Sequence, residues 1–313
     1  MLKKKDKILL KLADEFQIGK SANPNEQIKK LERLGKLPKK QAIEILNFFA
    51  TQESNPQSLL HIVKIIGRYN SKNSAGILID LLLWEEKYKG KFGCPEEYLQ
   101  VRCMVTKILG NLQSQDALIP LLHILNNKNE NYTLRLGAVE ALGKIGDKCV
   151  VVPLIDIVSN DEEKSIYLRE SAAKVLGILG DMRAIDPFIN ILETKKGIID
   201  KFTFLKERVI EAIAKLSIKD ERIIKALGNA LLDESAYIRL NAIEALAEIN
   251  DKRILDLIES MINDEEEDVG RSVINALYNI TNKKYIIDLL EKYDLRGWCK
   301  DEIETILTEE EEE

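Results

Sequence analysis

One short pattern recurs along most of the chain and constrains its fold more than any other feature. It is clearest in LRLGAVEALGKIGD from Leu134, LRESAAKVLGILGD from Leu168 and IRLNAIEALAEIND from Ile238. We take the basic residue after the first apolar residue as the anchor of each copy. The anchor positions are Arg102, Arg135, Arg169, Lys206, Arg239 and, in a sixth copy, Gly270. They lie 33, 34, 37, 33 and 31 residues apart. A repeated unit of this length predicts an array in which each unit packs mainly on its neighbours.

Each copy is predicted to be a helix with one buried face. The third, fourth, sixth, seventh and tenth residues after the anchor are apolar in nearly every copy. After Arg135 they are Ala138, Val139, Ala141, Leu142 and Ile145. At about 100° per residue these positions form one apolar stripe. A second apolar segment follows each copy, so the repeated unit is a pair of helices.

A small residue recurs at the eighth position after the anchor, as at Gly110, Gly143 and Gly177. Glycine inside a helix costs about 1 kcal/mol relative to alanine. Its recurrence in register therefore predicts that neighbouring helices approach closely there. The pairs Gly146-Asp147 and Gly180-Asp181 end their helices, since glycine favours the position after a helix and aspartate the start of the next element.

The motif RxxA…ALGxIGD resembles the HEAT family, and within it the repeats named after phycobilisome lyases (PBS lyase HEAT-like repeats). The resemblance covers about residues 57–293. It implies an all-α fold, a right-handed α-α superhelix or α-solenoid, with the anchor-bearing helices on the concave face. We expect a helical N-terminal cap over 1–55, the repeat array over 56–293, and a C-terminal capping helix with an unstructured acidic tail over 294–313. Inserts at 84–98 and 194–202 lengthen two connections.

The resemblance also assigns a role to the anchors. In that family an arginine at this place commonly bonds to the preceding inter-helix turn or to a neighbouring aspartate. We therefore expect a structural ladder of buried arginines rather than a binding site. Its members are Arg102, Arg135, Arg169 and Arg239.

The exposed side of the repeated helices carries the candidate binding residues. Aromatic residues stand two places before the anchor in three copies, and a row of this kind would suit a protein-binding hot spot. The alternative is that the rings fold back over the preceding turn. The candidate partner-binding residues are Tyr167, Phe204, Tyr237, Leu136, Leu240, Lys174, Glu211 and Glu244.

The charge pattern disfavours a nucleic-acid partner. The chain carries 46 basic and 52 acidic residues, a net charge of −6, whereas phosphate contacts by basic groups supply most non-specific nucleic-acid affinity. On the exposed helix side the signs alternate, which also fits a solvated surface of ion pairs. We expect another protein as the partner.

No motif for catalysis or cofactor binding is present, and we expect no metal or cofactor. Deoxyhypusine hydroxylase has related repeats but needs several His-Glu pairs, whereas the only histidines here, His61 and His123, are not followed by glutamate. The predicted function is a non-catalytic scaffold or adaptor that binds a protein along the concave face. The alternative is an enzyme of the bilin-lyase-like or HEAT-like DNA glycosylase type.

The remaining composition predicts a cytoplasmic protein. Four scattered cysteines form no CxxC pair, which disfavours a disulfide framework or a structural zinc site. No segment approaches the roughly 18 apolar residues of a spanning helix, and charges interrupt every apolar run near the N-terminus, so we expect no membrane association. Abundant Lys and Glu hint at a thermophilic source.

Overall fold

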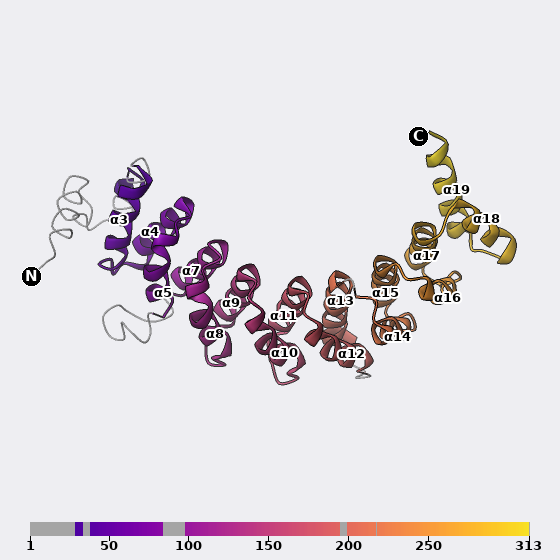
Figure 1. Ribbon diagram of the computed structural model, residues 1–313, viewed down its shortest axis with the longest axis horizontal. Coiled ribbons are helices and arrows are strands. Elements are labelled where there is room, and N and C mark those ends of the chain that lie inside the picture. Colours follow the sequence, from indigo (N-terminus) through magenta and orange to yellow (C-terminus); the bar gives the residue numbers. More distant parts are fainter. Residues whose placement is uncertain (1–28, 34–37, 84–97, 195–198, 217, 313) are drawn as a thin grey trace, which may run out of the picture. The chain divides into compact units, whose positions relative to one another are not determined.

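The computed structural model describes residues 29–33, 38–83, 98–194, 199–216 and 218–312 (Figure 1). Within these residues the regular elements are α-helices and short 3-10 turns, with no strand. Residues 1–28 and most of the two predicted inserts lie outside this description. The chain divides into two compact units, 1–150 and 151–313, which are described separately.

The first unit is an array of helices in which α7 packs on both α5 and α9, and α8 packs on α9. Residues 29–33 and helix α3 lie within the range predicted as a helical N-terminal cap, and α7 and α9 carry the anchors Arg102 and Arg135. The helices are α3 (Lys39–Ala50), α4 (Pro56–Tyr69), α5 (Ala75–Leu82), α7 (Leu99–Asn111), α8 (Leu118–Asn126) and α9 (Tyr132–Ile145).

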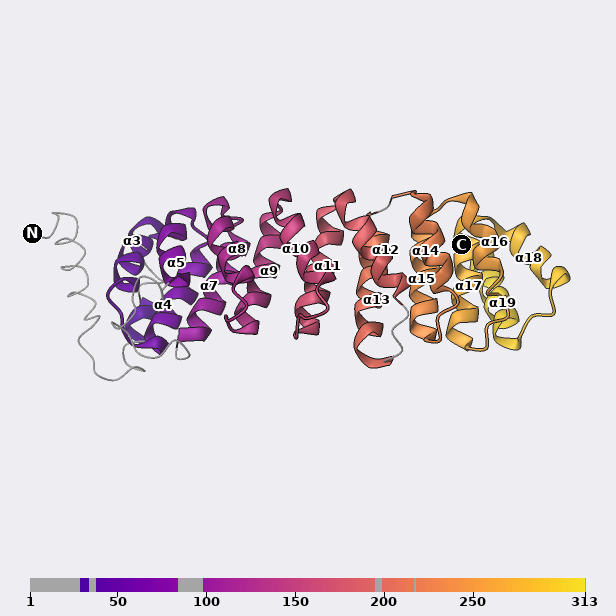
Figure 2. The ribbon, with the colours of Figure 1, turned by 90° about the horizontal axis from the view of Figure 1, so that it is seen from below.

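The second unit consists of two layers of helices. Its helices are α10 (Val151–Ser159), α11 (Ile166–Leu179), α12 (Ile185–Glu193), α13 (Ile199–Leu216), α14 (Glu221–Ala230), α15 (Ala236–Ile249), α16 (Leu255–Glu259), α17 (Glu267–Ile280), α18 (Lys283–Lys292) and α19 (Gly297–Glu312). In one layer α11, α13, α15, α17 and α19 each pack on the next. In the other, α10 packs on α12 and α12 on α14. Figure 2 shows these helices side by side. The described residues thus form the predicted all-α solenoid.

The predicted apolar stripe is the core of each repeat. In α9 the five stripe residues after Arg135 are all buried, from Ala138 to Ile145 at 7% exposure or less. The equivalent residues of α15, from Ala242 to Ile249, are at most 3% exposed. Burying a side chain of this kind contributes about 1.5–3 kcal/mol for the larger aliphatic residues. Stability therefore comes from the interfaces between neighbouring helices.

Close helix packing at the recurring glycines is confirmed where two helices of one unit meet. A Cβ atom on Gly110 of α7 would lie 2.8 Å from the Cα of Ala141, and one on Gly177 of α11 would lie 2.7 Å from the Cα of Ala212. Both distances are shorter than van der Waals contact allows. Glycine is required at these positions because the facing atom is backbone and cannot rotate away.

Both Gly-Asp pairs end their helices as predicted. Gly146 and Gly180 have φ angles of 77° and 64°, in the left-handed region that glycine enters without strain. The aspartate that follows each glycine accepts a backbone hydrogen bond in the next turn, Asp147 from Cys149 N at 2.8 Å and Asp181 from Arg183 N at 3.0 Å. The chain therefore reverses direction within a few residues.

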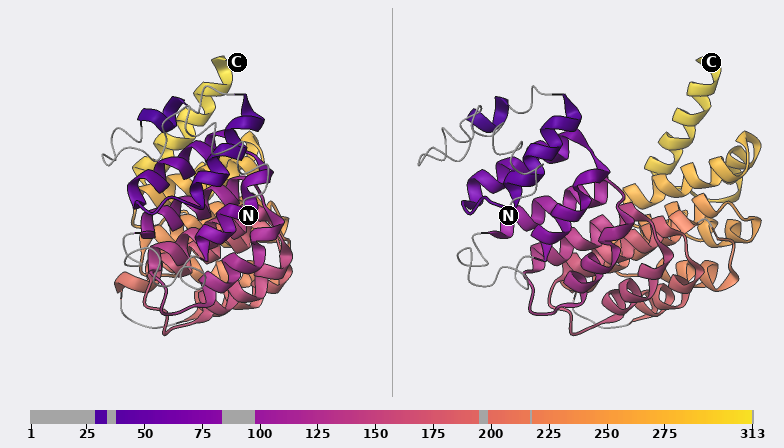
Figure 3. Two further views of the ribbon diagram at one scale, coloured as in Figure 1. Left: turned by 90° about the vertical axis from the view of Figure 1, so that its left-hand side faces the viewer. Right: turned by 60° about the vertical axis from the view of Figure 1, so that its left-hand side comes forward.

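The C-terminal end of the array differs from the expectation in one respect. The acidic tail, expected to be unstructured, continues α19 as far as Glu312, as the further views in Figure 3 show. Glutamate has a high helix propensity and no Gly or Pro interrupts the segment. The helix propensity of the glutamates therefore predicts this segment better than its acidic composition does.

The missing anchor of the sixth copy has a packing explanation. A Cβ atom on Gly270 would lie 2.9 Å from Trp298 Nε1 and 3.0 Å from Cys299 Sγ. Both residues belong to α19, the last helix of the layer. The side chains of the capping helix thus occupy the space where an anchor side chain would begin.

Candidate protein-binding face

The anchor arginines of the first unit bond to the preceding helix. The Nε atom of Arg102 donates to Leu82 O, and the Nε atom of Arg135 donates to Leu125 O, both at 3.0 Å. These carbonyls lie at the C-terminal ends of α5 and α8, where helices leave carbonyl groups without an intrahelical partner. Arg102 also binds both carboxylate oxygens of Glu130, at 3.2 and 2.7 Å. Each arginine therefore satisfies polar groups that burial would otherwise leave unpaired.

The second unit repeats this arrangement. Arg169 donates from Nε to Val158 O at 3.0 Å and lies 3.4 Å from Asp161. Arg239 donates to the carbonyls of Asp233 and Glu234 in the turn before α15. It also forms a bidentate ion pair with Asp264 of the next repeat. The arginine side chains of the ladder are buried, so they offer no surface to a partner.

A neighbouring aspartate was expected for the anchors, but the sequence analysis did not identify which acidic residues they bind, although a signal was present. Three anchors pair with an acidic residue of the next repeat. The pairs are Arg102 with Glu130, Lys206 with Asp233, and Arg239 with Asp264, separated by 28, 27 and 25 residues. A comparison of the repeat copies in the sequence would have shown that a carboxylate follows these three basic anchors 25 to 28 residues later.

The three predicted aromatic side chains are accessible on neighbouring helices. Tyr167, Phe204 and Tyr237 are 65%, 58% and 71% exposed. They lie at equivalent places on α11, α13 and α15, which pack on one another in that order. Exposure of this size leaves more than half of each residue open to solvent. Large exposed apolar groups in a row are a feature of binding surfaces.

The other predicted residues surround this row to different degrees. Leu240 and Glu211 are half-buried, whereas Lys174 and Glu244 are exposed. All four lie on α11, α13 or α15. Leu136, also half-buried, lies on α9 in the first unit, so it is not placed with the others. We call the exposed side of α11, α13 and α15 the anchor-helix face.

Two carboxylates on this face were missed. Glu170 and Glu207 each stand three residues after an aromatic residue of the row, are half-buried, and form no hydrogen bond or ion pair with another described residue. Burial raises the pKa of Glu170 against the opposing effect of Arg208. Burial also raises the pKa of Glu207; Arg208 opposes this, and the charges of Glu211 and Glu170 add to it. Glu170 and Glu207 each follow an anchor directly, a position that the helical period places on the exposed side. The period does not indicate that they would lack a hydrogen-bond or ion-pair partner.

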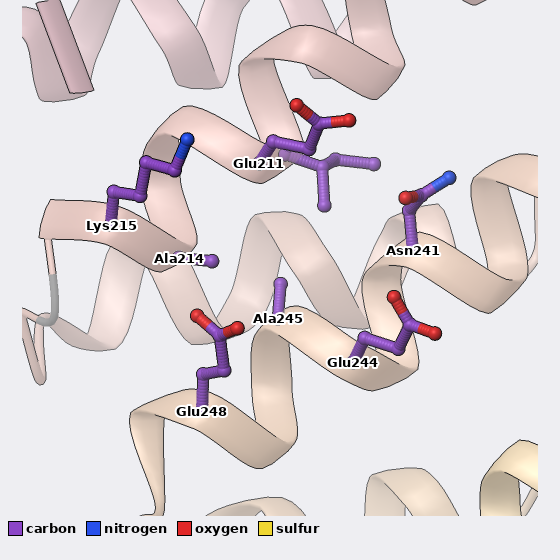
Figure 4. A pocket seen from close by; sticks show the side chains of 8 residues that line it. Glu211, Ala214, Lys215, Asn241, Glu244, Ala245 and Glu248 are labelled. Atoms are coloured by element: carbon purple, nitrogen blue, oxygen red, sulfur yellow. The ribbon is translucent and has the colours of Figure 1, made fainter. Parts of the chain in front are cut away.

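A cavity of about 180 Å³ opens between α13 and α15 on the same face (Figure 4). Ala214 and Ala245 lie between the polar side chains of the two helices, and Ile210 completes the apolar lining. The remaining lining residues are Glu211 and Lys215 from α13 and Asn241, Glu244 and Glu248 from α15. Small residues at the repeat positions thus leave a recess with an apolar floor and an acidic rim.

The arginines that follow the helix ends are already compensated by aspartates. Arg183, Arg222 and Arg253 each bond to the aspartate two residues earlier, at 2.7 to 2.8 Å for the closest pairs of atoms. Arg222 also reaches Asp186 of the preceding repeat at 2.6 Å. These arginines link turns and neutralise carboxylates, so they do not form a basic surface suited to phosphate groups.

A buried carboxylate holds the C-terminal helices together. Glu259 of α16 accepts hydrogen bonds from Tyr285 and Lys292 of α18 and, at 2.5 Å, from the hydroxyl of Tyr293. Burial alone would raise the pKa of Glu259, but the bonds from Lys292 and the two tyrosines outweigh it and lower that pKa. Burial, with help from Glu259, raises the pKa of Tyr285 to about 12. Every group has a partner, which indicates a structural role.

The described ranges contain neither a membrane-spanning helix nor a cluster of metal-binding side chains. None of the helices there is long and apolar enough to cross a membrane. No three His, Cys, Asp or Glu side chains of those ranges gather as metal ligands would.

The paired helices, the buried ladder and the repeated register define an α-solenoid. A family model for HEAT repeats matches residues 96–166, 128–201, 200–277 and 224–297, which together span more than half of the sequence. The chain belongs to the HEAT-repeat family. No curated protein matches its sequence.

Solved structures share the architecture at low sequence identity. YibA of Escherichia coli is 16% identical, with a TM-score of 0.50 over 88% of this chain and 94% of that one. The karyopherin Kap121p, bound to the extreme C-terminus of the protein phosphatase Cdc14p, is 11% identical, with a TM-score of 0.56 over 95% of this chain and 36% of that one. The complex of CpcE and CpcF of phycocyanin lyase from Nostoc sp. PCC7120 is 18% identical, with a TM-score of 0.43 over 74% of this chain and 94% of that one. At these identities the likeness to YibA and to Kap121p shows the fold alone.

Proposed function

We propose that this protein is a non-catalytic scaffold or adaptor that binds a segment of another protein along the anchor-helix face. The observation that carries the proposal is the row formed by Tyr167, Phe204 and Tyr237, more than half exposed on three adjacent helices. Aromatic side chains supply much of the binding energy at protein interfaces because they bury a large area with little loss of conformational entropy.

The rigidity of the layer beneath the row supports the same function. The helices that carry the three rings are held by buried contacts and by the arginine ladder. A surface that is already ordered loses little conformational freedom on binding. The fold is shared with Kap121p, which binds the extreme C-terminus of Cdc14p, so an array of this kind is able to bind a protein terminus.

We also propose two narrower assignments. The motif around Arg135 and Arg169 supports placing the repeats in the PBS lyase HEAT-like sub-type. The scattered cysteines support a cytoplasmic location, because they form no CxxC pair or other disulfide pattern.

The test is a selection of peptides from a random display library on the full chain, followed by affinity measurements. Peptides selected on the wild type should bind the double variant Tyr167→Ala/Tyr237→Ala at least about tenfold more weakly, since a hot-spot residue contributes about 2 kcal/mol or more. The matched control is Ile119→Ala/Val152→Ala, which removes two exposed apolar side chains from α8 and α10. Equal affinity for both double variants contradicts the proposed face.

A further inference from the structure

We propose that the partner segment is extended and basic, with apolar side chains at every third position. This inference rests on the proposed function and adds to it the chemistry of the ligand. It arises from three features of the anchor-helix face: the spacing of the aromatic row, the unpaired carboxylates beside it, and the recess between α13 and α15.

The spacing of the row favours an extended ligand. The three rings occupy equivalent places on α11, α13 and α15, and packed helices lie about 8–10 Å apart. A polyproline II segment rises about 3.1 Å per residue and has three residues per turn. Every third side chain of such a segment therefore points the same way, about 9 Å from the previous one. An extended chain crossing the helices could place one apolar side chain on each ring.

The charge of the face favours basic residues between those apolar positions. Five carboxylates, Glu170, Glu207, Glu211, Glu244 and Glu248, face three cationic groups, Lys174, Arg208 and Lys215. Arg208 binds both oxygens of Glu211 at 2.7 Å, so this pair is neutral, and four carboxylates remain against two lysines. The excess of negative charge repels an acidic segment and attracts Lys or Arg.

Two of the half-buried carboxylates lie beside a ring of the row. Glu170 follows Tyr167 by three residues and Glu207 follows Phe204 by three, which places them about 4.5 Å further along the helix axis. A Lys or Arg side chain could contact the face of the ring and the carboxylate together. A cation would also offset the burial that raises the pKa of Glu170 and of Glu207.

The recess between α13 and α15 provides a place for one long side chain. Its volume of about 180 Å³ exceeds that of an engineered cavity of about 150 Å³ that binds benzene. Ile210, Ala214 and Ala245 suit the methylene groups of a Lys or Arg, and Glu244 and Glu248 lie at the rim for its charged end. Neither rim carboxylate pairs with another described residue.

The probes for the test are blocked peptides of about four Leu-Lys-Pro units, in which proline favours the extended form. Two reference peptides replace every Lys by Glu or every Leu by Ala. The full chain should bind the Leu-Lys-Pro peptide saturably, and at least about tenfold more tightly than either reference peptide at low ionic strength. Added salt should weaken binding, because the carboxylates are partly exposed.

Protein variants then separate charge from apolar contact. Glu244→Gln/Glu248→Gln should weaken binding of the Leu-Lys-Pro peptide about five- to tenfold. The control Asp156→Asn/Asp288→Asn removes the same charge from exposed positions on α10 and α18 and should change affinity less than twofold. Equal weakening by both double variants would indicate general attraction only and overturn the inference.

The outcomes also separate this inference from the proposed function. No saturable binding of the Leu-Lys-Pro peptide, or equal binding of the Leu-Glu-Pro peptide, overturns the assignment of a basic ligand. If display-selected peptides still lose affinity for Tyr167→Ala/Tyr237→Ala, the protein-binding face stands with a ligand of other charge. If those peptides lose no affinity for that variant, the face itself is wrong.

Discussion

The guanidinium group of Arg239 and the carboxylate of Asp264 form two parallel hydrogen bonds, of 2.9 and 2.8 Å, between consecutive repeats. Both side chains are buried, at 9% and 7% exposure. Burial disfavours two separate charges, so the pair is favourable only when its geometry is complete. The Nη1 atom of Arg239 donates to the carbonyls of Asp233 and Glu234, in the turn before α15. One residue thus fixes a turn and the position of the next repeat.

Removing this anchor should destabilise the second unit. Arg239→Ala leaves the Asp264 carboxylate buried without its partner, and breaking a buried pair in this way costs about 3 kcal/mol or more. Urea unfolding measures the loss. The control Arg253→Ala removes an exposed arginine that also pairs with an aspartate, Asp251, and should leave stability nearly unchanged. If the two variants lose similar amounts of unfolding free energy, the burial of the Arg239–Asp264 pair does not determine how much it contributes to stability.

Adding one methyl group at the close helix contact should also destabilise the protein. In Gly177→Ala the new Cβ would lie 2.7 Å from the Cα of Ala212. Overpacking costs about 1–3 kcal/mol, against a gain of about 1 kcal/mol in helix propensity. We expect a net loss of up to about 2 kcal/mol by urea unfolding. The matched variant is Gly76→Ala in α5. A Cβ atom at this position would have no neighbour within 4 Å, so the substitution should be neutral or slightly stabilising. The account of the contact fails if Gly177→Ala behaves like Gly76→Ala.

The repeat itself could be predicted from the sequence, since its signals are local. The apolar stripe from Ala138 to Ile145, the small residue at Gly177 and the helix end at Gly180 depend only on spacing and residue size. The pairing of Arg239 with Asp264 was not predicted, because it joins residues of different repeats. The close approach of Trp298 to Gly270 was not predicted either, because these residues also lie on different helices. The aromatic row was predicted as a pattern, but its exposure depends on side-chain positions that periodicity does not specify.

The buried cluster around Glu259 should make stability depend on pH. The folded-state pKa of Glu259 is lowered, so its contribution is present above the unfolded value of about 4.3 and is lost as the pH falls through the folded value. At pH 7, Glu259→Gln should lower the free energy of unfolding by about 1.5–3 kcal/mol, the range for hydrogen bonds to charged groups. Unfolding curves at descending pH should bring the variant and the wild type together. A difference that persists unchanged at pH 3 contradicts this assignment.

The carboxylate of Glu207 should behave in the opposite way. Its folded-state pKa is raised, so the charged form is disfavoured in the folded protein at neutral pH, and stability increases as the pH falls through that value. Glu207→Gln should therefore leave the thermal midpoint at pH 7 unchanged or raise it, while it weakens binding of the Leu-Lys-Pro peptide. A lower midpoint together with unchanged binding would give Glu207 a structural role instead.

The most direct test of the binding face is photocrosslinking from Phe204. Benzoylphenylalanine introduced at this position keeps an aromatic ring in the row between Tyr167 and Tyr237. Irradiation of the full chain with a display-selected peptide should give a covalent adduct, which excess unlabelled peptide should suppress. The same photoreactive residue at Ile119, which is 71% exposed on α8, serves as the control and should give little adduct. Equal adduct at both positions, or adduct at Ile119 alone, would contradict binding along α11, α13 and α15.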